Sequence, residues 1–168
     1  MITFLKNKLI DGGKNTNNMK KIFLLLLIPS LIFAEARMTP LINLIQDEDW
    51  VKNKKTQLYI MQRCLAINGG LSSGTRTDKN KEMIEESSKK MTWFLNFSVS
   101  LYNSIYKSIE PREENEVNNL IIKRSGEMLS LYMEYMQEDY LLTGSPYGEP
   151  LMGDRNVCDA IYNLDRVE

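Results

Sequence analysis

The sequence predicts an all-α protein, a compact bundle of three main helices and a short C-terminal helix, stapled by one disulfide bond. Apolar residues recur at helical spacing over three long stretches, and no stretch alternates apolar and polar residues over a useful strand length. Gly, Pro and small polar residues gather between these stretches and set the helix ends. Side chains are expected to pack as in ordinary helical bundles.

The first helix is predicted over about 49–68, after a short apolar connector at 37–46. The acidic run at 47–49 lies where the dipole of a helix N-terminus favours negative charge. The run Asn-Gly-Gly at 68–70 is expected to end the helix. Its predicted apolar face consists of Val51, Leu58, Met61 and Leu65, with Cys64 beside it.

Thr77 or Asp78 is expected to cap a second helix that runs to about residue 109. Pro111 should end that helix and occupy the first turn of a third, which runs to about residue 142. Gly126 in mid-helix costs about 1 kcal/mol relative to alanine. It indicates either a kink or the close approach of a neighbouring helix, and the sequence does not distinguish them.

The segment Thr143–Gly153 is rich in Gly and Pro and is predicted to be an extended surface strap. Asp154 is expected to cap the last helix, over about 155–166. Its inner side should carry Val157, Cys158, Ile161 and Leu164.

Residues 19–36 have the three parts of a secretory signal peptide. Lys20 and Lys21 precede an apolar run at 22–33, and Ala34 and Ala36 flank Glu35 as an A-x-A cleavage site. The alternative is an uncleaved membrane anchor, but a spanning helix needs about 20 apolar residues. Cleavage after Ala34 or Ala36 is expected.

The predicted signal peptide divides the chain into three segments. Residues 1–18 show no apolar periodicity, and we expect them to be a start-site artefact, with Met19 as the true start, or a disordered leader. Residues 19–36 form the signal. Residues 37–168 have the size of one helical domain, which is expected to be periplasmic or secreted.

Composition excludes several classes of function. The chain has no histidine, which removes Ser-His-Asp and Cys-His nucleophile systems and the usual zinc ligand. The chain has 21 Lys and Arg residues and 22 Asp and Glu residues. It contains no block of basic residues of the kind that binds nucleic acid or anionic lipid. The cluster Lys52, Lys54 and Lys55 reads as a solvated helix face. No cofactor, no metal, no nucleic-acid partner and no membrane insertion of the mature chain are expected.

Cys64 and Cys158 are the two cysteines of the chain. An even count in an oxidising compartment favours one intramolecular disulfide bond over two free buried thiols. In the chain-entropy model, a crosslink that closes so long a loop stabilises the folded protein by about 4–5 kcal/mol, before any strain in the bond is subtracted.

Two groups of side chains suggest ligands but have simpler interpretations. Met128, Met133 and Met136 are compatible with a copper(I) thioether site, yet their spacing scatters them around the helix and favours core packing. Five tyrosines on the two long helices are compatible with a ligand groove, although core and rim packing is the favoured role. They are Tyr102, Tyr106, Tyr132, Tyr135 and Tyr140.

Paired carboxylates are the catalytic route that composition leaves open. Glu86-Ser87 is similar to the Glu-Ser pair of lytic transglycosylases, but the Gly-Leu-Met-Gln-type stretch that should follow is missing. Lys89 and Lys90 instead suit i,i+4 ion pairs with Glu85 and Glu86.

The sequence therefore predicts an exported binding or interaction module of the cell envelope without enzymatic activity, and it identifies no catalytic or ligand-binding residue. Its partner is expected to be another protein or an envelope component. The alternatives are a carboxylate-dependent glycan hydrolase of lysozyme type and a membrane-tethered envelope protein.

Overall fold

The computed structural model describes residues 38–164 apart from 47 and 75, so the predicted leader and signal peptide lie outside the described residues. The elements are α3 (Leu41–Ile45), the 3₁₀ turn η1 (Glu48–Val51), α4 (Lys54–Ser72), α5 (Lys81–Tyr106), α6 (Glu114–Thr143) and α7 (Leu151–Leu164). This part of the chain contains no strand, which confirms the all-α prediction of three long helices and a short C-terminal one.

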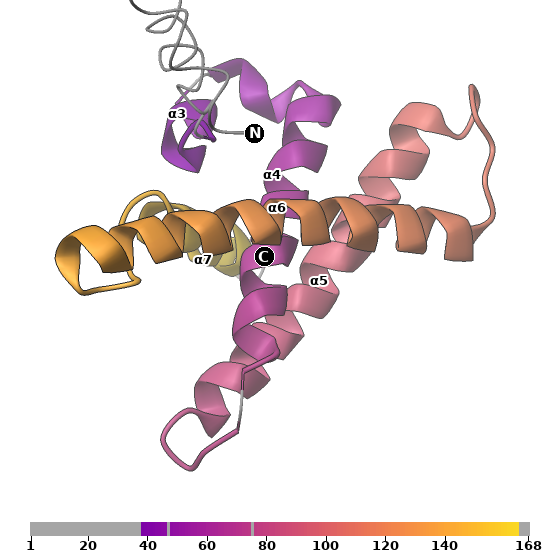
Figure 1. Ribbon diagram of the computed structural model, residues 1–168. Coiled ribbons are helices and arrows are strands. Elements are labelled where there is room, and N and C mark those ends of the chain that lie inside the picture. The colour runs from indigo at the N-terminus through magenta and orange to yellow at the C-terminus, as the bar shows by residue number, and fades with distance from the viewer. Residues whose placement is uncertain (1–37, 47, 75, 165–168) are drawn as a thin grey trace, which may run out of the picture. The chain divides into compact units, whose positions relative to one another are not determined.

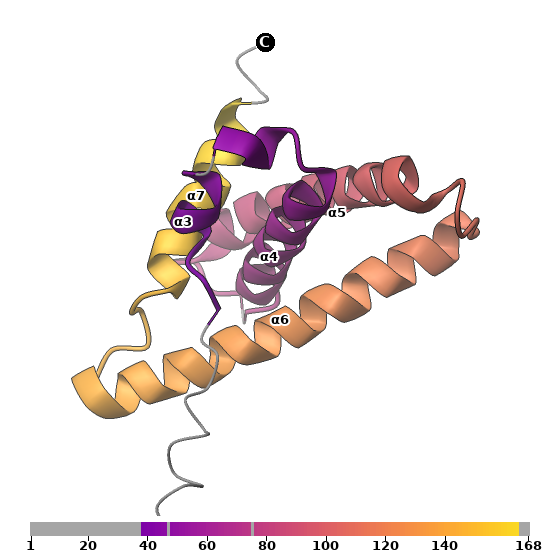
Figure 2. The ribbon, with the colours of Figure 1, turned by 90° about the horizontal axis from the view of Figure 1, so that it is seen from above.

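Helices α4 and α5 form an antiparallel pair, and α6 crosses both of them (Figure 1). Helix α7 packs beside α4, and the short α3 lies against α7 (Figure 2). The core lies between these helices and includes Leu58, Ile60, Met61, Leu65, Phe94, Leu101, Val117, Ile121 and Val157. Within the described residues, none of the helices has the length and apolar character that a membrane crossing requires.

The first predicted helix differs from the structure at both ends. Asn53 divides it, because its side chain accepts hydrogen bonds from the backbone N–H groups of Lys55 and Thr56 and so starts α4 there. At the other end α4 continues through the two glycines that were expected to stop it. A Cβ on Gly70 would lie 2.7 Å from Cδ1 of Leu129 in α6, so Gly70 allows a close helix contact.

The second and third helices are confirmed with shifted ends. Helix α5 ends at Tyr106, and the N–H groups of Ile109 and Glu110 close tight turns on the Tyr106 carbonyl. Pro111 lies in the connection rather than in the first turn of α6, which starts at Glu114. Gly144, with a φ of 76°, ends α6 in the left-handed conformation that glycine adopts readily.

The predicted cap at Asp154 is wrong. Helix α7 already begins at Leu151, so the strap is shorter than expected and Gly153 is helical. Asp154 is fully buried in the first turn of α7, and its Oδ1 accepts a hydrogen bond from the backbone N–H of Leu41 at 2.6 Å. The carboxylate therefore binds the start of α3, a short helix within the segment that was expected to be a connector.

The predicted disulfide bond is present and joins α4 to α7. The sulfur atoms of Cys64 and Cys158 are 2.07 Å apart and the Cα atoms 5.4 Å apart. Both cysteines are completely buried. The bond closes a loop across 94 positions of the chain and holds the last helix against the first long one.

We predict that the unfolded, unreduced protein has no free thiol in a titration with a thiol reagent. A variant with both cysteines replaced by alanine should stay helical in far-UV circular dichroism but melt lower by about 10 °C, because the crosslink restricts the unfolded chain. Two titratable thiols per chain would contradict the assignment.

Candidate functional site

Both tryptophans of the chain border one hollow of about 300 Å³. We call this hollow the aromatic groove. Its lining comes from η1, α4, α5 and α7 and consists of Trp50, Gln57, Met61, Trp93, Phe97, Ile161 and Leu164. None of these seven side chains is charged, so the groove suits apolar and planar surfaces.

Aromatic contacts fix the orientation of Trp93. Its ring stacks on Phe97 with centroids 5.2 Å apart and meets Tyr162 edge-on at 5.6 Å. Phe94, which is fully buried, contacts it edge-on from the core side at 4.9 Å. The indole is therefore held in one position, while Phe97 stays 37% exposed at the rim.

One polar group of the groove is used within the fold. The side-chain amide of Gln57 donates a hydrogen bond to the backbone carbonyl of Val51, which joins η1 to α4 beside Trp50. Leu164, 72% exposed, lines the groove at the end of α7. The groove thus combines a rigid aromatic wall with an accessible apolar edge.

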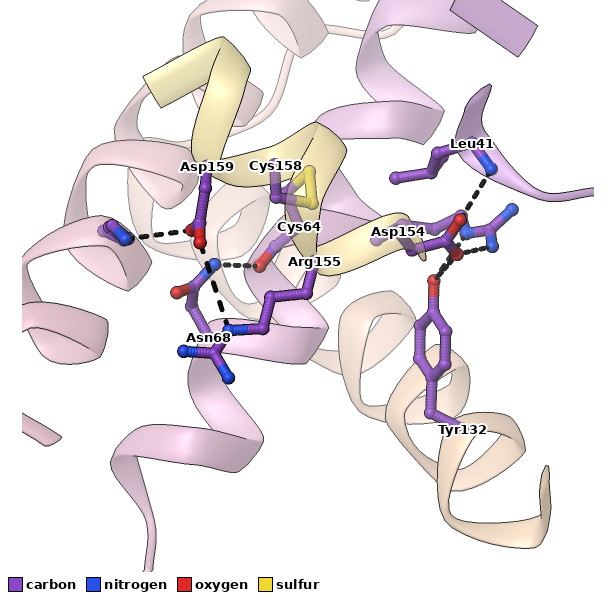
Figure 3. The surroundings of a disulfide bond; sticks show 10 residues. Leu41, Cys64, Asn68, Tyr132, Asp154, Arg155, Cys158 and Asp159 are labelled. Carbon is purple, nitrogen blue, oxygen red and sulfur yellow. Dashed lines mark hydrogen bonds and ion pairs between the residues drawn. A yellow bond between two sulfur atoms is a disulfide. The ribbon is translucent and has the colours of Figure 1, made fainter. Parts of the chain in front are cut away.

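A buried ionic network lies around Asp154, on the same helix as Cys158 of the disulfide (Figure 3). Its carboxylate accepts hydrogen bonds from Nη2 of Arg63, from the hydroxyl of Tyr132 and from the N–H of Leu41. Nε of Arg63 donates to the Tyr132 oxygen at 2.9 Å, and its Nη1 donates to the carbonyl of Thr39. Four elements, α3, α4, α6 and α7, meet at this network or directly beside it.

The charges of this network are fixed by their surroundings. Burial opposes the charge of Arg63, but Tyr132 and Asp154 outweigh burial and raise its pKa. Burial raises the pKa of Tyr132, and the hydrogen bond to Asp154 raises it further, so the hydroxyl stays protonated and donates. All three side chains are almost inaccessible to solvent. The network therefore holds the fold together and offers no free group for chemistry.

Glu86 lies on the exposed side of α5 and forms the predicted ion pair with Lys90, with Oε1 and Nζ 2.5 Å apart. The hydrogen bond from Lys90 lowers the pKa of Glu86. Nζ of Lys90 also contacts Oδ1 of Asp159 in α7 at 2.9 Å. A glycosidase acid needs the opposite shift, a raised pKa in an apolar pocket, so Glu86 has the properties of an ion-pair partner.

The other predicted candidates are not brought together at one site. Met133 and Met136 border one hollow and Met128 borders another, so the three sulfur atoms share no hollow. The five tyrosines are also spread over different surroundings. Tyr102, Tyr132 and Tyr135 are buried, Tyr106 is half-buried and packs on Tyr102, and Tyr140 is exposed.

Comparison with known proteins assigns the chain to no family. The sequence matches no family model, and neither a curated protein nor a solved structure shows significant similarity to it. The aromatic groove was not predicted from the sequence. The pair Trp93 and Phe97, four residues apart on one helix face, is the sequence feature from which part of the groove could have been inferred.

We predict that Asp154→Ala lowers the free energy of unfolding by about 3–5 kcal/mol, because it leaves the Arg63 charge buried without its partner. Asp159→Ala on the same helix is the matched control. Asp159 is half-exposed, and loss of its ion pair should cost about 1 kcal/mol or less. Urea unfolding of both variants measures the difference, and equal losses would contradict the central role of Asp154.

Proposed function

We propose that this protein is an exported, non-enzymatic binding module of the cell envelope and that the aromatic groove is its contact surface. The observation that supports the proposal is that both tryptophans line one accessible groove, with Trp93 held in place by Phe97, Phe94 and Tyr162. Tryptophan is enriched among the residues that dominate binding energy. A rigid indole also supplies a large contact area at a low entropic cost.

Export is supported by two independent features. Residues 19–36 have the charged, apolar and small-residue parts of a signal peptide in the required order. The disulfide bond between Cys64 and Cys158 suits an oxidising compartment, where such bonds persist.

A binding role agrees better with the described residues than the glycan-hydrolase alternative. Such a hydrolase needs two carboxylates facing a shared cleft, one of them with a raised pKa. None of the five hollows described for residues 38–164 is lined by two carboxylates. The pKa of Glu86, the one carboxylate with a motif to suggest it, is lowered.

The lining of the groove defines the kind of partner it suits. Its seven side chains are uncharged, and three aromatic side chains and three aliphatic or thioether side chains surround the one amide. A partner that inserts an apolar side chain there removes apolar area from water on both sides, which favours association. We therefore expect an apolar anchor on a protein partner or envelope component.

Export predicts a defined N-terminus. Protein recovered from an export-competent host should have an intact mass that corresponds to a chain starting at Glu35 or Arg37. An uncleaved chain in the membrane fraction would instead support the membrane-tethered alternative.

We predict that Leu164→Glu prevents capture of the partner, because it places a charge at the apolar rim of the groove. In a pull-down from the solubilised cell envelope of the source organism, the component bound by the wild type should fall at least about fivefold. Leu142→Glu is the matched control, since Leu142 is 80% exposed on α6, outside the groove.

Quantitative mass spectrometry of the captured material measures both variants. A component enriched by the wild type and by Leu142→Glu but lost with Leu164→Glu would support the groove as the contact surface. Equal capture by all three proteins would show that binding occurs elsewhere.

A further inference from the structure

A second hollow, of about 260 Å³, lies where α6 crosses α4 and α5. We call it the interhelical hollow. It is lined by Leu65, Ala66 and Gly69 of α4, Met91 and Leu95 of α5, and Ile122, Ser125, Gly126 and Leu129 of α6. None of these residues lines the aromatic groove, so the two sites are separate.

Small residues keep this hollow open. A Cβ on Gly126 would meet no atom within 4 Å, and one on Gly69 would approach only Sδ of Met91, at 3.9 Å. One end is bounded by Leu129, which packs on Gly70. Glycine is among the least favourable residues inside a helix, and the packing around Gly126 gives no reason for it. No close helix contact explains Gly126, which is exposed and borders the hollow.

Ser125 is the one polar residue in the lining. It is 4% exposed, and its hydroxyl is buried without a hydrogen-bond partner among the described residues. A helical serine can donate to the carbonyl four residues earlier, but this hydroxyl makes no such bond. A buried hydroxyl without a partner is unfavourable, and each such group in a folded protein calls for an explanation.

We propose that the interhelical hollow binds a small neutral apolar ligand that carries one hydrogen-bonding oxygen and that Ser125 is its polar contact. The eight other lining residues supply apolar surface or backbone only, and no lining residue is charged. A charged group buried there would lack a partner and be strongly disfavoured.

The volume of the hollow limits the size of the ligand. An apolar cavity of about 150 Å³ is known to hold one benzene molecule. The interhelical hollow, at about 260 Å³, therefore has room for two fused aromatic rings or a medium-length alkyl chain. A phenol or an alcohol of this size meets both requirements, apolar bulk and a single oxygen.

Two probes test the proposal, 1-naphthol and naphthalene, which share one ring system and differ by the hydroxyl group. Ligand-observed NMR titration of the purified protein should show saturable binding of one molecule of each probe per chain. We expect 1-naphthol to bind about five- to tenfold more tightly than naphthalene, the contribution of one hydrogen bond to a buried hydroxyl.

Three variants separate the contributions. Ser125→Ala should bind both probes with about the naphthalene affinity, because only the hydrogen bond is removed. Gly126→Leu should fill the hollow and abolish binding of both, with folding checked by circular dichroism. Ser130→Ala is the control, since Ser130 is exposed on the same helix and its hydroxyl donates to the Gly126 carbonyl. Its affinities should match the wild type.

Several results would overturn the proposal. They are a wild type that binds neither probe saturably, a folded Gly126→Leu variant that binds as the wild type does, and a Ser125→Ala variant that still prefers 1-naphthol. If Gly126→Leu does not fold, the comparison of the two probes on wild type and Ser125→Ala decides the matter. Since Leu164 lies outside this hollow, failure here leaves the aromatic-groove proposal unaffected.

Discussion

The arrangement of the helices depends on one buried carboxylate. Asp154 has three donors from three different parts of the chain, the N–H of Leu41, the guanidinium of Arg63 and the hydroxyl of Tyr132. A buried ion pair is weak evidence for stability, because the free energy needed to remove two charges from water offsets much of the attraction between them. Its effect is on specificity, since a competing arrangement that separated these groups would leave a charge buried alone.

The disulfide reinforces the same junction. Arg63 and Cys64 are neighbours on α4, while Asp154 and Cys158 lie four residues apart on α7 and so share one helix face. An ionic link and a covalent link thus join the same two helices about one turn apart, which fixes both the distance and the rotation of α7. The contact of Lys90 with Asp159 adds α5 to the junction. The position of Leu164 at the rim of the aromatic groove follows from this clamp.

Much of the fold could be predicted because it depends on local sequence. Helical spacing of apolar residues located α5 and α6, the αL preference of glycine located the end of α6 at Gly144, and the cysteine count gave the disulfide pair. The prediction for Asp154 was wrong because an aspartate after a Gly-rich strap has the local features of a helix cap. Its burial depends on Arg63, 91 positions away, and no local pattern marks an arginine inside an apolar helix as a buried partner.

The hollows were missed for a related reason. Gly69 and Gly70 have the local features of a helix stop, and only the crossing of α6 shows that one glycine admits Leu129 and the other borders open space. That Trp50 and Trp93 line one groove likewise depends on how η1 packs on α3 and α4. Sites made between helices require the tertiary arrangement, whereas the helices themselves are specified by residues close in sequence.

The complete burial of Cys64 and Cys158 has a kinetic consequence. Thiol–disulfide exchange requires an attacking thiolate to reach a sulfur atom, and both sulfur atoms lie behind packed side chains. A reductant must therefore wait until α7 separates from α4, so the lifetime of the bond in a reducing medium is set by the rate of that opening. Because the Asp154 network opposes the same separation, it also governs how long the crosslink survives.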